Sequence, residues 1–167
     1  MKRIHFLALL GCLASQAAIA QDLPAPTGPV VLTVSGQITR TNGEGVAAFD
    51  QAMLDALEHR TTTTATPWLE GVHDFSGPTG AAILEAVGAT GDTLQVIALN
   101  DYAADVPAAD MTEHAVIFAT AVDGNRLSVR DKGPLFLIYP FDEEPALFNE
   151  VYFGRSVWQI TRIDVRN

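Results

Sequence analysis

Segments rich in apolar and β-branched residues recur along the chain and predict strands. Residues 30–38 read VVLTVSGQI, a composition typical of a strand. Residues 94–99 and 135–139 are apolar runs, which predict buried strands. Between residues 157 and 165 apolar and polar positions alternate, so we expect a terminal strand there.

Turn-forming residues extend this pattern of strands. Residues 115–121 predict a further strand, and the Asp123-Gly124 pair that follows favours a tight turn. We therefore expect a hairpin whose second strand is 127–130. Residues 61–64 are four threonines, whose β-branching favours extended structure, and Pro67 prevents a helix from continuing there.

Two short segments have helical spacing. Phe49, Met53 and Leu57 recur every four residues and predict an amphipathic helix of about ten residues, with Asp50 near its positive end. A second short helix is predicted around 83–87 and ends at Gly88. Many strands with two inserted helices indicate an α+β, β-dominated fold of mixed sheets. We assign residues 30–167 to one domain.

The first 20 residues have the features of a secretory signal. Lys2 and Arg3 precede a short apolar run, and the segment ends in the small-residue site Ala18-Ile19-Ala20. We expect cleavage after Ala20 and export to the periplasm, with residues 21–29 as an extended, proline-rich leader. The sequence around Cys12 also resembles a lipoprotein processing site, which is the alternative interpretation. After cleavage we expect no membrane span.

Composition narrows the classes of function. With 48% hydrophobic and 18% charged residues the chain is not of a disordered type. A formal charge of −10 argues against binding nucleic acid, because a phosphate backbone attracts basic surfaces. The single cysteine, Cys12, lies in the predicted signal, so the exported domain would have no thiolate ligand or nucleophile.

Three polar turns are candidates for a binding site. Residues 100–102 (Asn-Asp-Tyr) follow a predicted strand, residues 130–134 (Arg-Asp-Lys-Gly-Pro) separate two strands, and Trp68 follows the threonine tract. Strand ends are common ligand positions because their side chains leave the core on a rigid base. The alternatives are an Asx turn, an ordinary solvated turn and a core tryptophan, respectively. We expect Trp158, in the terminal strand, to lie in the core.

Common catalytic motifs do not occur in the sequence. The four histidines have no spacing typical of metal ligands, so we expect no histidine metal site. No serine lies in a G-x-S-x-G context, and no glycine-rich phosphate loop occurs. The residues alone therefore indicate polar turns without a catalytic constellation.

The order of several motifs resembles one enzyme family. In sequence order they are T-A-T-P-W at 64–68, F-S-G-P at 75–78, A-L-N-D-Y at 98–102, D-V-P at 105–107, D-G at 123–124, R-D-K-G-P at 130–134 and V-W at 157–158. This combination resembles the molybdopterin-binding domain of the sulfite-oxidase-like oxidoreductases, especially a small exported subgroup. The resemblance covers about residues 30–165 and implies the mixed, partly barrel-like sheets of that family.

The resemblance also identifies a substitution at the metal position. In the family's enzymes a cysteine four residues before a tryptophan binds molybdenum; here Trp68 matches the tryptophan and Thr64 occupies the cysteine position. A threonine hydroxyl stays protonated near neutral pH, whereas a thiolate is a soft, charged ligand. We therefore do not expect a molybdenum cofactor or the family's redox catalysis.

The exported subgroup that the chain resembles suggests a different role. This subgroup is similar to periplasmic regulators that bind reduced pterins. These regulators act on a membrane-bound sensor or enzyme of cyclic di-GMP signalling. The resemblance implies this function for the present chain. The alternatives are an oxidoreductase subunit that carries a molybdopterin cofactor, and an adaptor module without a ligand.

A pterin ring presents an N–H and an amino group beside a carbonyl oxygen, so a carboxylate and an N–H donor would recognise its edge. Asp101 and Asp131 are the candidate carboxylates, and Asn100 and Arg130 are the candidate donors. Either Trp68 or Tyr102 would cover the ring face. We expect Trp68, Asn100, Asp101, Tyr102 and Arg130 to converge on one pocket.

Overall fold

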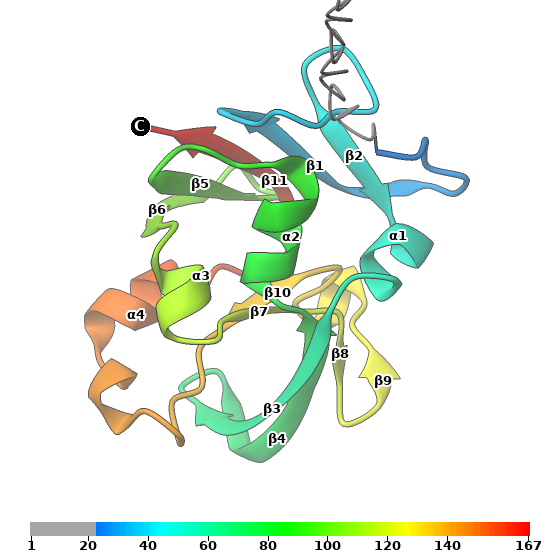
Figure 1. Ribbon diagram of the computed structural model, residues 1–167. Helices are drawn as coiled ribbons and strands as arrows, with labels where there is room; N and C mark the ends of the chain where they lie inside the picture. Colours follow the sequence, from blue (N-terminus) through cyan, green and yellow to red (C-terminus); the bar gives the residue numbers. More distant parts are fainter. Residues whose placement is uncertain (1–22) are drawn as a thin grey trace, which may run out of the picture.

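The computed structural model describes residues 23–167, which form a strand-dominated α+β fold with several sheets (Figure 1). The largest sheet has five strands in the order β2-β1-β11-β5-β6. Their bounds are β1 (Val30–Gly36), β2 (Ala47–Asp50), β5 (Thr93–Ala98), β6 (Ala103–Pro107) and β11 (Ile160–Arg166). β1 and β11 run parallel, and the other neighbours are antiparallel. The predicted signal peptide, residues 1–20, lies outside the described residues.

A second layer of strands lies below this sheet in Figure 1. A four-stranded sheet has the order β3-β4-β8-β9, and a two-stranded sheet pairs β10 with β7. Their bounds are β3 (His59–Thr66), β4 (Leu69–Pro78), β7 (Ile117–Ala119), β8 (Ala121–Val122), β9 (Asn125–Arg126) and β10 (Phe136–Ile138). The hairpin of β3 and β4 projects away from the five-stranded sheet and carries Trp68 at its turn.

Four short α-helices connect the strands: α1 (Gln51–Asp55), α2 (Gly80–Val87), α3 (Asp110–Glu113) and α4 (Glu150–Arg155). Thr79 caps the start of α2: its hydroxyl accepts a hydrogen bond from the Ala82 N–H at 3.1 Å. It ends at Gly88 in the left-handed conformation, as the sequence predicts. Among residues 23–167, no helix is both long and apolar enough to cross a bilayer.

The buried side chains form two clusters. The larger contains the inward-facing residues of β1, β5 and β11 together with those of α2, and the smaller is centred on Phe75 and Phe136. Trp68, partly buried, packs against both clusters. The hairpin turn is therefore fixed to the core on two sides.

Most predicted strands are present, but the first predicted helix is much shorter than expected. Phe49 lies in β2, where it pairs with Leu32, and α1 has only five residues. The reason is Asp50: its carboxylate accepts a hydrogen bond from the Met53 N–H at 2.9 Å, which caps the helix one residue after Phe49. Phe49 and Met53 therefore belong to different elements despite their helical spacing.

The predicted hairpin turns at Asp123-Gly124, but its second strand is displaced. The paired residues are Asn125 and Arg126, not 127–130. Residues 129–131 form a 3₁₀ turn because the backbone N–H groups of Asp131 and Gly133 both donate to the Ser128 carbonyl. β4, β6, α3 and α4 are elements that the sequence pattern does not indicate.

Candidate functional site

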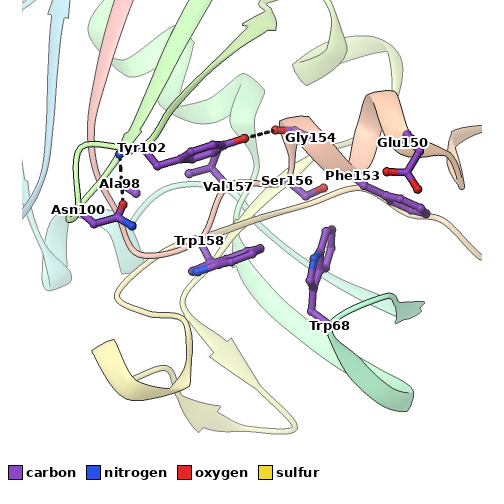
Figure 2. A pocket seen from close by; sticks show the side chains of 10 residues that line it. All are labelled: Trp68, Ala98, Asn100, Tyr102, Glu150, Phe153, Gly154, Ser156, Val157 and Trp158. Carbon is purple, nitrogen blue, oxygen red and sulfur yellow. Dashed lines mark hydrogen bonds between the residues drawn. The ribbon is translucent and has the colours of Figure 1, made fainter.

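A cavity of about 420 Å³ opens between the hairpin turn, α4 and the ends of β5 and β11. Its volume lies within the usual range for small-molecule pockets. Figure 2 shows the ten lining residues, which are Trp68, Ala98, Asn100, Tyr102, Glu150, Phe153, Gly154, Ser156, Val157 and Trp158.

Aromatic rings form the walls of this pocket. The Trp68 ring lies 5.8 Å from the Trp158 ring and 5.9 Å from the Phe153 ring, both in edge-to-face arrangements. Trp68 also contacts Phe136 of the core at 5.5 Å, which fixes its orientation. Rings held in this way offer rigid, apolar faces to a flat ligand at little cost in conformational entropy.

Trp158 corrects one expectation from the sequence. Its side chain is not in the core: it is 38% exposed and lines the pocket. It precedes β11 and forms an isolated bridge with Phe136, so its ring leaves the sheet where the regular strand has not yet begun. The ammonium group of Lys132 lies 4.9 Å from the ring centroid, a cation–π contact.

Polar groups join the two sides of the pocket. Asn100 accepts a hydrogen bond from the Tyr102 N–H at 3.2 Å through its side-chain oxygen, which leaves its amide nitrogen free for other partners. The Tyr102 hydroxyl donates to the Gly154 carbonyl at 3.3 Å, connecting the five-stranded sheet to α4 (Figure 2). The Ser156 hydroxyl donates back to the Tyr152 carbonyl at the end of α4.

A buried polar network fixes the C-terminal end of α4. The Tyr139 hydroxyl donates to the Asp110 carboxylate at 2.6 Å, and the Arg155 guanidinium donates to the same oxygen at 2.9 Å. Burial, together with the adjacent carboxylate, raises the pKa of Tyr139 well above its usual value, so this hydroxyl remains a donor. Arg155 also lies over the ring of Tyr152. The helix that carries Glu150, Phe153 and Gly154 is thereby attached to the core.

The structure brings together only some of the residues that the sequence nominates. Trp68, Asn100 and Tyr102 line the pocket. Asp101 does not: it has a positive φ of 63°, and its carboxylate bonds to Arg162 at 2.6 Å beside a different hollow. The expected convergence of all five residues is therefore incomplete.

The two remaining candidate site residues, Arg130 and Asp131, lie on the 3₁₀ turn after β9. This turn is exposed, and neither residue is among those that line the pocket. The Asp131 carboxylate accepts a hydrogen bond from the Ser128 hydroxyl at 2.6 Å, an interaction within the turn. The same loop reaches the pocket through Lys132, which contacts Trp158.

Thr64 lies away from the pocket as well. It is fully buried in β3, and its hydroxyl accepts a hydrogen bond from the Asp142 N–H and donates to the Ala65 carbonyl, both at 3.1 Å. Within residues 23–167, no group of three or more His, Cys, Asp or Glu side chains is arranged to hold a metal ion.

The sequence pattern did not indicate the contribution of α4. Glu150 and Phe153 belong to a six-residue helix, which is too short to show an amphipathic period. Asn149 was the available signal: it caps the helix by accepting a hydrogen bond from the Val151 N–H at 3.0 Å, and an acidic residue follows it.

Comparisons with known proteins concern the fold. No family model matches the chain, and no curated protein matches it. Among solved structures, the sulfane dehydrogenase SoxCD from Paracoccus pantotrophus matches with a TM-score of 0.59 at 16% sequence identity. The match covers 81% of this chain and 37% of the SoxCD chain. This likeness establishes a shared fold over roughly a third of the neighbour's length.

Proposed function

We propose that this chain is an exported, non-catalytic protein that binds a reduced pterin in the pocket of Figure 2. The observation that carries the proposal is the set of aromatic walls around a cavity of about 420 Å³. A flat heterocycle placed against Trp68 or Trp158 gains about 0.5–1.5 kcal/mol from ring contacts beyond its burial. The motifs that resemble the sulfite-oxidase-like domain, and the fold shared with a dehydrogenase, support a pterin as the heterocycle.

The donor set does not fit a molybdenum cofactor. Thr64, which occupies the position of the family's cysteine, is buried and already bonded to Asp142 and Ala65. A cofactor phosphate also requires cationic partners, whereas the ten residues lining the pocket include no Lys, Arg or His. We therefore expect no stoichiometric molybdenum in protein purified from its native periplasm. Finding it there would favour the alternative of an oxidoreductase subunit.

Tryptophan fluorescence provides a direct test of binding. The chain has two tryptophans, and both line the pocket. Anaerobic titration with 6-methyltetrahydropterin is therefore expected to change this emission and to saturate. An emission that does not respond in a saturable way would overturn the proposal.

A pair of variants connects the signal to the pocket. Trp158→Ala removes a ring that lines the cavity and is expected to weaken calorimetric affinity about tenfold, because loss of a stacked ring costs on the order of 1–3 kcal/mol. Val72→Ala removes an apolar side chain that is exposed but does not line the pocket, so its affinity should match that of the wild type. Equal losses in the two variants would contradict the assignment of the site.

We further propose that a membrane-bound partner in cyclic di-GMP signalling senses the bound pterin in the periplasm. A partner responds only if it distinguishes the occupied protein from the empty one. Tyr102 and Trp158 are 52% and 38% exposed, so a ligand between them changes the surface that a partner would touch.

Deletion of the gene is expected to change cellular cyclic di-GMP. Restoring the wild-type chain should reverse the change, and restoring Trp158→Ala should not. Unchanged cyclic di-GMP after deletion would refute the signalling role while leaving pterin binding intact.

A further inference from the structure

One carboxylate in the pocket has no assigned role. Glu150 is the single charged side chain among the ten residues that line it. The two carboxylates nominated from the sequence are engaged elsewhere, Asp101 with Arg162 and Asp131 with Ser128. Glu150 is therefore the carboxylate of the cavity, and Lys132, which lies over Trp158, is the nearby cation.

The Glu150 carboxylate is available to a ligand. Within residues 23–167, its side chain has no hydrogen-bond or ion-pair partner, and it is exposed at the first turn of α4. Figure 2 shows Glu150 and Asn100 at opposite ends of the pocket, with the rings of Trp68 and Trp158 between them. A ligand that fills this space presents one end to a carboxylate and the other to an amide.

The chemistry of a carboxylate restricts which end faces it. An ionised carboxylate accepts hydrogen bonds and donates none, and its two oxygens match two parallel N–H donors. A carbonyl or another acceptor placed against it is rejected, because both groups are then desolvated without a partner. None of the ten lining residues is cationic, and Lys132 reaches the pocket only through its contact with the Trp158 ring.

We propose that Glu150 is a specificity-determining residue that accepts hydrogen bonds from the 2-amino group and adjacent ring N–H of the bound heterocycle. It thereby selects pterins over lumazines, in which an oxygen replaces the 2-amino group. This inference rests on the proposed function, since it assumes that a pterin occupies the aromatic pocket. Selection arises from one replacement on the ligand, a donor by an acceptor, against a carboxylate that can only accept hydrogen bonds.

The test combines two ligands with three forms of the protein. Affinities for 6-methyltetrahydropterin and 6-methyltetrahydrolumazine are measured by anaerobic calorimetry on the wild type, Glu150→Gln and Glu85→Gln. Glu85 is an exposed carboxylate on α2 that does not line the pocket, so its variant controls for the loss of one negative charge. Urea denaturation of each variant checks that the fold is retained.

We expect the wild type and Glu85→Gln to prefer the pterin by about tenfold to a hundredfold, the factor for a hydrogen bond to a charged group. Glu150→Gln is expected to lose most of this preference, because the amide has one acceptor and one donor in place of two acceptors. Pterin binding with equal affinity for the lumazine, or an unchanged preference in Glu150→Gln, overturns the inference alone. Failure of both ligands to bind the wild type overturns the proposed function with it.

Discussion

Replacing Tyr139 with phenylalanine tests the network that fixes α4. The ring is fully buried, so Tyr139→Phe preserves the packing and removes only the hydroxyl, which donates to Asp110 at 2.6 Å. Loss of a hydrogen bond to a charged group costs about 1.5–3 kcal/mol. Arg155 still donates to Asp110 at 2.9 Å, so the larger cost of an unpaired buried charge does not apply. We expect the free energy of unfolding to fall by about 2 kcal/mol.

Urea denaturation followed by tryptophan fluorescence measures this change. With a slope of about 2 kcal/mol per M, the unfolding midpoint should fall by about 1 M while the slope stays constant. Tyr152→Phe is the matched control, because the Tyr152 ring contacts Tyr139 at 5.1 Å but its hydroxyl has no hydrogen-bond partner among residues 23–167. Its effect should stay below about 0.5 kcal/mol. Midpoints that are equal for the two variants would refute the stabilising role of the Tyr139 hydroxyl.

Three further predictions concern other parts of the fold. Hydrogen bonds from backbone N–H groups, of which that of Met53 has the largest effect, lower the pKa of Asp50 from 3.8 to about 2. The ionised carboxylate therefore stabilises the fold fully above about pH 4, and this stabilisation is lost as the pH falls through 2. The difference between the unfolding midpoints of the wild type and Asp50→Ala should narrow over that interval. Gly77→Ala should prevent stable folding, because the added Cβ would lie 2.2 Å from a backbone oxygen of β7. In Gly154→Ala the added Cβ meets no atom within 4 Å, and alanine favours the helix, so the melting temperature should rise slightly. A thiol placed at the buried position 64, in Thr64→Cys combined with Cys12→Ser, should react with Ellman's reagent only after unfolding; rapid labelling of the native protein would contradict its burial.

The sequence predicted the elements that are determined by interactions between residues close together in the chain. The β-branched composition of β1 and the left-handed terminator Gly88 of α2 act over a few residues, and both elements lie where the pattern places them. Phe49 shows the limit of this reasoning. Its spacing to Met53 suits a helix, but pairing with Leu32 and the cap at Asp50 determine its actual conformation.

The candidate site could be predicted only in part, for a related reason. Asn100, Asp101 and Tyr102 are adjacent in sequence, and no periodicity indicates which of them face the same way. The left-handed backbone at Asp101 and its ion pair with Arg162 place its carboxylate outside the pocket, while its two neighbours line it. The opposite wall comes from α4, about 50 residues away in sequence: the Tyr102–Gly154 hydrogen bond spans 52 positions.

The central position of β11 has a consequence for biogenesis. Residues 160–166 lie between β1 and β5, so the sheet joins partners as distant as Ser35 and Asp164, 129 positions apart. Strands this far apart in sequence pair slowly, because the entropy of closing the long intervening loop is lost before any stabilising contact forms. A growing chain cannot complete this sheet until residues 160–166 have left the ribosome. For a chain exported as we propose, this slow closure would prolong the unfolded state that passage through a translocation channel requires.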